Sequence, residues 1–277
     1  MSDNTNPIFI VGSGRSGTRS LYRMLTGSLG VEIHHEYAVN ETQRLAALFF
    51  MGKVDSNYVK DKIKEMHGAS IHYSAASIWI DSSNKLSWLI EPLSELFPQS
   101  RFLAIVRDGR KVVSSFYYKL REEMYDDAST KLLKNWLDGM DDVVPPAEKP
   151  IWWNIPQAGQ PWHDEFPSFN RLQRVSYHWA EVNRVIIEGF SKIAADRVML
   201  VRLEDLVSSE SKLDEVLDFL SIPKCDTYAE YLKTPRNVFM PLDFQLTKSQ
   251  MRIFDQICAP MMTKLGYIQK EAYRVSY

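Results

Sequence analysis

The sequence is poor in cysteine and lacks any long apolar run. Only two of its 277 residues are cysteines, Cys225 and Cys258, and they lie far apart, outside any Cys-x-x-Cys spacing. We therefore expect no disulfide framework and no metal site, which fits a reducing compartment. No apolar segment is long enough to span a bilayer, and residues 1–7 lack the apolar core of a secretory signal. These absences predict a cytoplasmic protein without a membrane span.

The chain also lacks an excess of basic charge. Its formal net charge is −2 and its isoelectric point is about 6.3. Nucleic-acid-binding domains more often carry a broad positive field, so we expect no nucleic-acid partner. Any anion must then be bound by local basic residues and helix N-termini. The composition, 45% hydrophobic and 25% charged, is ordinary for a globular protein of this length.

Short apolar runs alternate with helical patterns along most of the chain. The predicted strands are 8–11, 31–34, 77–81, 102–106 and 198–201. The predicted helices are 17–29, 38–67 with an interruption near Gly52, 85–97, 110–123, 169–195, 209–220, 226–233 and 247–264. This alternation predicts a three-layer α/β fold, in which helices cover both faces of a central parallel sheet.

Residues 139–167 interrupt the alternation with six prolines and three tryptophans, Trp152, Trp153 and Trp162. The prolines exclude a long helix, so we expect a structured loop or insertion. No repeat, low-complexity tract or linker is visible, which predicts one domain over 1–277 that contains this insertion. The tryptophans suit stacking on a sugar or aromatic ring, covering of a lipid, or packing within the loop.

A glycine-rich segment, Gly12-Ser13-Gly14-Arg15-Ser16-Gly17-Thr18, connects the first predicted strand to the first predicted helix. Glycines let the backbone approach an anion closely, and the following helix directs unpaired N–H groups to the same place. The simplest alternative is a tight turn without a ligand. We expect a phosphate-binding loop.

The glycine spacing alone does not identify the nucleotide. Gly12 and Gly17 fit the P-loop of nucleotide kinases, but Thr18 stands where that motif requires lysine. With Gly14 they also fit the GxGxxG pattern of dinucleotide-binding proteins, and Glu36 lies near the position of a ribose-binding acid. An NAD-dependent oxidoreductase is therefore an alternative at this point.

A second basic motif follows the buried strand at 102–106. Arg107 ends this strand, and Ser115 comes eight residues later in the next predicted helix. An arginine and a serine so placed can converge on one phosphate, because arginine offers a two-pronged donor and serine adds a hydroxyl. A dinucleotide-binding enzyme has no reason to carry this pair here.

Together these motifs resemble the sulfotransferases that use 3′-phosphoadenosine-5′-phosphosulfate (PAPS), most closely the tyrosylprotein and bacterial-type branches. GSGRSGTRSL at 12–21 resembles the family's 5′-phosphosulfate loop, although Gly14 replaces its usual proline, and 102–119 resembles the 3′-phosphate motif. VRLEDL at 201–206 and the segment 246–267 resemble further family elements. The likeness extends from about residue 8 to 268 and implies a P-loop-like fold.

The resemblance implies PAPS as sulfuryl donor and PAP as product. The loop residues implied to contact the donor are Ser13, Gly14, Arg15, Ser16, Gly17, Thr18 and Arg19. Arg107 and Ser115 correspond to the pair that holds the 3′-phosphate. Arg236 and Asn237 lie where the family has a loop that covers the cofactor.

The family's chemistry implies a base that accepts the proton of the acceptor hydroxyl. In tyrosylprotein sulfotransferases it lies twenty-one residues after the basic residue of the loop, which here corresponds to Glu36. Cytosolic sulfotransferases use a histidine instead, but the matching segment at 81–84 contains none. His35, and next to it His34, are the alternatives, and Arg15 is expected to stabilise the leaving phosphate.

The sequence departs from the family at one catalytic position. Several relatives have a sulfuryl-contacting lysine where this chain has Ser82, and Lys85 is the nearest residue that could compensate. The acceptor is not readable beyond a hydroxyl-bearing small molecule, glycan or lipid, and the oligomeric state is not readable at all. A PAPS-binding protein without catalysis is the second alternative.

Overall fold

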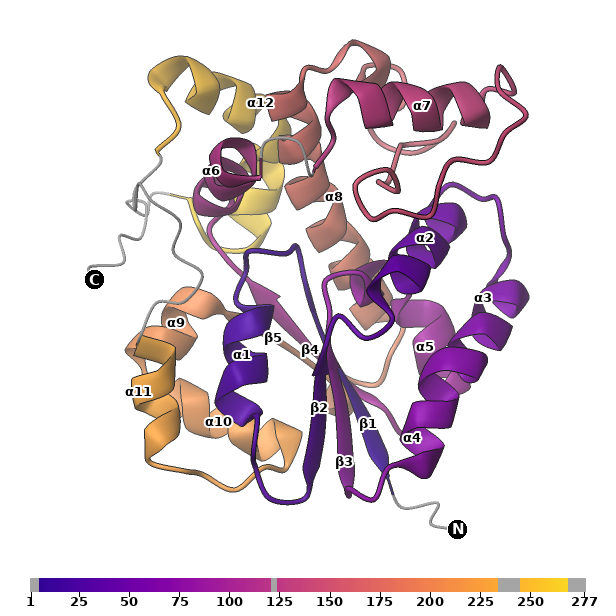
Figure 1. Ribbon diagram of the computed structural model, residues 1–277. Helices are drawn as coiled ribbons and strands as arrows, with labels where there is room; N and C mark the ends of the chain where they lie inside the picture. Colours follow the sequence, from indigo (N-terminus) through magenta and orange to yellow (C-terminus); the bar gives the residue numbers. More distant parts are fainter. Residues whose placement is uncertain (1–4, 121–123, 234–244, 269–277) are drawn as a thin grey trace.

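Five parallel strands form the central sheet of the molecule. The computed structural model describes residues 5–120, 124–233 and 245–268. The strands are β1 (Asn6–Gly12), β2 (Val31–His35), β3 (Ile78–Ser82), β4 (Arg101–Val106) and β5 (Val198–Arg202). Their order is β2-β3-β1-β4-β5, and every neighbouring pair is parallel. All strands therefore present their carboxyl ends at one edge of the sheet, as Figure 1 shows.

Helices connect the strands and cover both faces of the sheet. They are α1 (Thr18–Leu25), α2 (Val39–Phe50), α3 (Ser56–Ile63), α4 (Ala69–Tyr73), α5 (Ile90–Leu96), α6 (Gly109–Lys119), α7 (Asp127–Leu137), α8 (Arg171–Ser191), α9 (Leu203–Ser208), α10 (Glu210–Leu220), α11 (Thr227–Lys233) and α12 (Lys248–Lys264). The predicted three-layer α/β fold is confirmed.

Strand β1 shows why both faces are covered. Ile8 and Ile10 pack against the layer formed by α1, α9, α10 and α11, whereas Phe9 and Val11 pack against α2, α3, α5 and α8. All four side chains are fully buried. A continuous apolar run is what a parallel strand buried on both faces requires.

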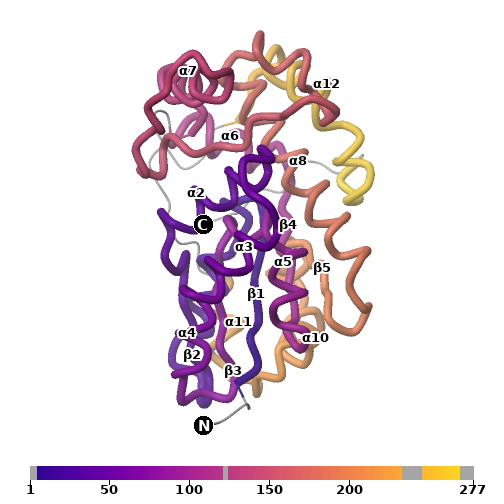
Figure 2. Tube along the Cα trace, turned by 90° about the vertical axis from the view of Figure 1, so that its right-hand side faces the viewer, coloured from indigo at the N-terminus to yellow at the C-terminus, as the bar shows by residue number. Residues whose placement is uncertain are grey.

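A third apolar cluster lies beyond the carboxyl ends of the strands. It joins α6, α7, α8 and α12 to the segment around Trp152 and Trp153, which are both buried. Figure 2 shows α6, α7 and α12 gathered at this end of the molecule, above the strands. These elements cover the edge of the sheet at which a ligand site is expected.

Several sequence predictions of local structure need correction. Residues 139–165 contain no helix or strand, but the preceding helix α7 was not predicted. Its N-terminus is capped by the Asp126 side chain, which accepts a hydrogen bond from the Ser129 N–H. The interruption that the sequence predicted near Gly52 is confirmed, because α2 ends at Phe50 and α3 begins at Ser56. The predicted helix at 85–97 is reduced to a short 3₁₀ turn and α5.

Candidate active site

The glycine-rich loop has a backbone that only glycine adopts without strain at two positions. Gly14 and Gly17 have φ angles of 77° and 115°, and Arg15 shares the left-handed region at 54°. A Cβ on Gly14 would lie 2.8 Å from Asn84 Nδ2, and one on Gly17 would lie 2.8 Å from Leu203 Cδ1. A loop curled in this way at a helix N-terminus is suited to an anion.

Buried side chains hold the loop from beneath. The Gly12 N–H donates to Ser87 Oγ at 3.0 Å, and the Ser87 hydroxyl donates to the Gly12 carbonyl at 2.9 Å. His178 Nε2 donates to the Ser13 carbonyl at 3.2 Å. Burial, together with the nearby Lys85 charge, lowers the pKa of His178 to about 3. A neutral histidine therefore anchors the loop to α8.

The structure brings the two basic motifs together. Arg15 Nε donates to Ser115 Oγ at 2.9 Å, and an Arg107 terminal nitrogen donates to the Arg15 carbonyl at 3.0 Å. Arg107 Nε and Ser16 Oγ are buried and have no hydrogen-bond partner among the described residues. Buried polar groups without partners are costly, so these atoms fit a site that an anionic ligand completes.

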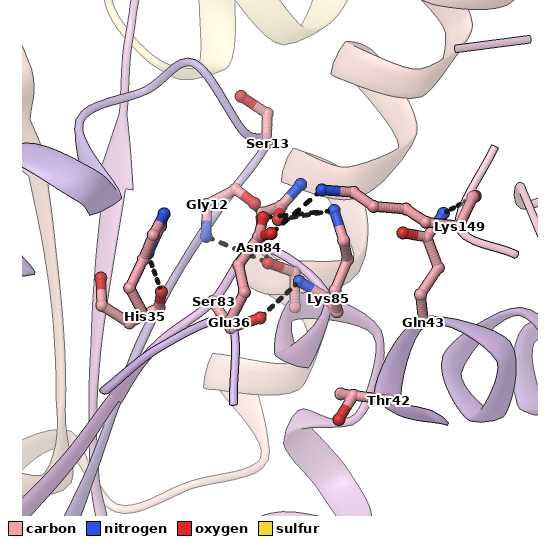
Figure 3. A network of polar contacts seen from close by, with 12 residues as sticks. Gly12, Ser13, His35, Glu36, Thr42, Gln43, Ser83, Asn84, Lys85 and Lys149 are labelled. Carbon is pink, nitrogen blue, oxygen red and sulfur yellow. Dashed lines mark hydrogen bonds and ion pairs between the residues drawn. The ribbon is translucent and has the colours of Figure 1, made fainter. Parts of the chain in front are cut away.

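Glu36 follows β2 and lies between two lysines, as Figure 3 shows. Its Oε2 is 3.0 Å from Lys149 Nζ, and its Oε1 is 3.6 Å from Lys85 Nζ. Burial opposes ionisation of the carboxyl group, but the two ammonium charges outweigh it and lower the pKa of Glu36 to about 2. Glu36 is therefore ionised and doubly paired.

The backbone of Glu36 is held in a left-handed conformation, with φ of 55°. Its N–H donates to the Ser82 carbonyl at 3.3 Å, and the next N–H, that of Tyr37, donates to Asp81 Oδ1 at 3.3 Å. The other Asp81 oxygen lies 3.2 Å from His67 Nε2, and both side chains are fully buried. This pair fixes the turn that presents Glu36.

Lys85, and not Ser82, occupies the pocket. The Ser82 hydroxyl donates to the Thr18 carbonyl at 2.8 Å and supports the start of α1. Lys85 Nζ donates to Asn84 Oδ1 at 2.8 Å and lies 5.9 Å from the centre of the Trp153 ring. Burial lowers the pKa of Lys85 to about 8, although Glu36 opposes the shift. Of the two residues, Lys85 therefore lines the pocket and Ser82 does not.

The two histidines differ in their position. His35 lines the pocket, donates through Nδ1 to the Ser82 carbonyl at 2.7 Å and stacks on Tyr22. Burial lowers the pKa of His35, so it is neutral near pH 7. His34 instead contacts Glu32 and is not among the pocket residues. Of the two, only His35 remains an alternative base.

Most of the predicted site residues line one pocket, which has a volume of about 380 Å³. The predicted residues that line it are Gly14, Arg15, Gly17, Thr18, Arg19, His35, Glu36 and Arg107. Ser13, Ser16 and Ser115 are not in its lining, although Ser115 contacts Arg15. Arg236 and Asn237 lie outside the described residues.

Three polar lining residues, Ser20, Asn84 and Lys149, were not assigned to the site from the sequence. Trp153, one of the tryptophans suited to stacking, also lines the pocket. The only signal for Lys149 was the unusual composition of the Pro- and Trp-rich segment to which it belongs. Among the described residues, no group of histidine, cysteine, aspartate or glutamate could hold a metal ion. No helix in the same part of the chain is long and apolar enough to cross a membrane.

Comparisons with known proteins identify the family and the fold. A family model described as the sulfotransferase family matches residues 7–149. A similar solved structure is the sulfotransferase domain from the curacin biosynthetic pathway, with a TM-score of 0.52, 16% identity, and coverage of 96% of this chain and 99% of that chain. Another is the sulfotransferase STF9 from Mycobacterium avium, with a TM-score of 0.50, 11% identity, and coverage of 99% and 79%. No curated protein sequence matches significantly.

Proposed function

The chain belongs to the sulfotransferase family, and we propose that it transfers the sulfuryl group of PAPS to an acceptor hydroxyl. One observation carries this proposal. Arg15 contacts both Ser115 and Arg107, and the two arginines line the same pocket as Glu36 and Lys85. A cationic phosphate site thereby faces a carboxylate and a lysine. The family assignment supports sulfuryl transfer, and PAPS as the donor and the roles of the individual residues are proposed.

The phosphates of the donor are held by the glycine-rich loop and its two arginines. The loop and the start of α1 bind the 5′-phosphosulfate, and Arg15 stabilises the charge that the leaving phosphate gains. Arg107 and Ser115 bind the 3′-phosphate. The buried Arg107 Nε without a partner supports this assignment, because a phosphate oxygen would satisfy it.

Glu36 and Lys85 act on the acceptor and on the sulfuryl group. As the acceptor oxygen bonds to sulfur, the bond from sulfur to the phosphate oxygen breaks, and the hydroxyl proton passes to Glu36. Lys85 offsets negative charge on the sulfuryl oxygens. Acceptors of three kinds suit this step, namely hydroxyl-bearing small molecules, glycans and lipids.

The protein is proposed to act in the cytoplasm as a single domain over 1–277. Two unpaired cysteines, of which Cys225 is exposed, are in keeping with a reducing compartment.

Calorimetry with PAP, PAPS and NADH, followed by transfer of labelled sulfate from PAPS, tests this function. We expect PAP and PAPS to bind, NADH not to bind, and label to reach a hydroxyl compound. Binding of NADH alone would favour an NAD-dependent oxidoreductase. Binding of PAP without transfer to any hydroxyl in a broad panel would favour a non-catalytic PAPS-binding protein.

A further inference from the structure

Lys149 reaches the pocket from the Pro- and Trp-rich segment rather than from the sheet. Its ammonium group lies 3.0 Å from Glu36 Oε2, on the opposite oxygen from Lys85. The Lys149 side chain is 41% exposed, whereas that of Lys85 is only 6% exposed. Lys149 therefore stands at the open side of the pocket, where an acceptor must enter.

The position of Lys149 is fixed by its backbone. Gln43 Nε2, on α2, donates to the Lys149 carbonyl at 3.0 Å and to the Trp152 carbonyl at 2.7 Å. The indole N–H of Trp152 donates to the Pro146 carbonyl at 2.7 Å, and the ring is buried. The buried Gln43 and Trp152 side chains thus fix the backbone of Lys149 within reach of Glu36, which distinguishes it from an ordinary surface lysine.

Proton transfer to Glu36 would leave Lys149 without a counter-charge. While Glu36 is ionised, its carboxylate is shared between two ammonium groups. Once Glu36 carries the acceptor's proton it is neutral, and Lys85 then faces the sulfuryl oxygens. Lys149 has no such partner among the described residues of the pocket, since Glu36 is the only acidic residue in its lining. An unpaired ammonium beside the base opposes the transfer.

We propose that Lys149 binds an anionic group of the acceptor, a carboxylate, sulfate or phosphate near the reacting hydroxyl. This inference rests on the proposed function and names its substrate class. An acceptor of this kind draws Lys149 away from Glu36 and frees the carboxylate to accept the proton. A neutral acceptor leaves Lys149 paired to Glu36 and the base weak. The apolar wall of Phe116, Leu120 and Trp153 contacts the rest of the acceptor.

Matched pairs of charged and neutral hydroxyl compounds test the proposal. Suitable pairs are 4-hydroxybenzoate with its methyl ester, 3-hydroxybutyrate with its methyl ester, and glucose 6-sulfate with glucose. Each is measured as a ligand of the PAP complex by calorimetry and as an acceptor of labelled sulfate from PAPS. For at least one pair we expect the wild type to prefer the charged member at least tenfold. Lys149→Met should abolish the preference and Lys149→Arg should retain it.

The exposed Lys131 of α7 provides the matched control, and Lys131→Met should behave as the wild type. The proposal would be overturned if the wild type bound the charged and the neutral member of every pair with the same affinity and sulfated them at the same rate. So would a charged-member preference that persists in Lys149→Met. Failure of the proposed function is recognised separately, because the wild type would then either not bind PAP or transfer no label to any hydroxyl compound.

Discussion

The carboxylate of Glu36 lies between two ammonium groups, and the three charges determine how the pocket titrates. The pKa of Glu36 is lowered to about 2 and that of Lys85 to about 8. Because the pKa of Glu36 is below its ordinary value of 4.5, the ion pairs add stability above about pH 4.5, and this stability is lost as the pH falls toward 2. Lys85 has the opposite effect, because burial of its charge costs stability below about pH 8, and the cost is relieved as the pH rises toward 10.5.

Lys85 should impose an alkaline limit on activity. Because kcat/KM reports the ionisation of the free enzyme, the kcat/KM for PAPS should fall with an apparent pKa near 8 as Lys85 loses its charge. Lys85→Arg keeps the charge at every accessible pH, so in this variant the alkaline limb should move above pH 10. If the kcat/KM of the wild type and of Lys85→Arg showed the same dependence on pH, Lys85 would be excluded from the sulfuryl site.

Replacement of Glu36 by glutamine keeps the shape of the side chain and removes its basicity. Glu36→Gln should therefore reduce turnover by about a hundredfold or more, because a positioned base contributes roughly 10²–10⁴ to the rate. PAP affinity, measured by calorimetry on the same preparation, should remain close to that of the wild type. His35→Ala is the comparison, and a larger loss of turnover there than in Glu36→Gln would move the base to the histidine.

Replacement of Arg107 separates the two phosphate sites of the donor. Arg107→Ala should weaken PAP binding by about 1.5–3 kcal/mol, as expected for a charge-assisted hydrogen bond. Adenosine 5′-phosphosulfate lacks the 3′-phosphate, so its affinity should change much less. Arg252→Ala, an exposed arginine on α12, is the control. Equal losses for both ligands would contradict the 3′-phosphate assignment.

At the scale of elements, the loop between β1 and α1 combines strain with close contact. Gly17 and Gly27 both have left-handed φ angles, but a Cβ would meet Leu203 at Gly17 and nothing within 4 Å at Gly27. Each alanine variant should be less stable to denaturant by about 1–3 kcal/mol, because the backbone strain is common to both. Only Gly17→Ala should also lose PAP affinity. Equal PAP binding in the two variants would remove the loop from the donor site.

The elements that the sequence predicted are those whose signal is local. The strand at 102–106 and the loop at 12–18 are readable because apolar runs and glycine spacing depend on neighbouring residues. Lys149 could not be predicted as a pocket residue, because it meets Glu36 across 113 positions of sequence. The roles of Ser82 and Lys85 could not be predicted either. They depend on which side chain of the segment 82–85 points toward the pocket, and the sequence does not show this.

For the whole molecule, ligand binding and folding are linked. A ligand that binds only the folded chain at about 100 times its Kd adds about 2.7 kcal/mol of stability. For a protein of this size that corresponds to a rise in Tm of roughly 4–6 °C. PAP should produce this rise in a thermal melt, and NADH should leave Tm unchanged. A stabilising effect of NADH that matches that of PAP would count against the donor specificity.

The contacts that build the donor site also determine when the site can appear during folding. They join residues that lie 92, 100 and 165 positions apart, namely Arg107 with Arg15, Arg15 with Ser115, and His178 with Ser13. Each requires closure of a long chain loop, which is entropically unfavourable and slow. Partially folded forms that have only the first strands and α1 therefore lack the site. Binding competence should arise late, once α8 has docked beneath the loop and joined the two halves of the sequence.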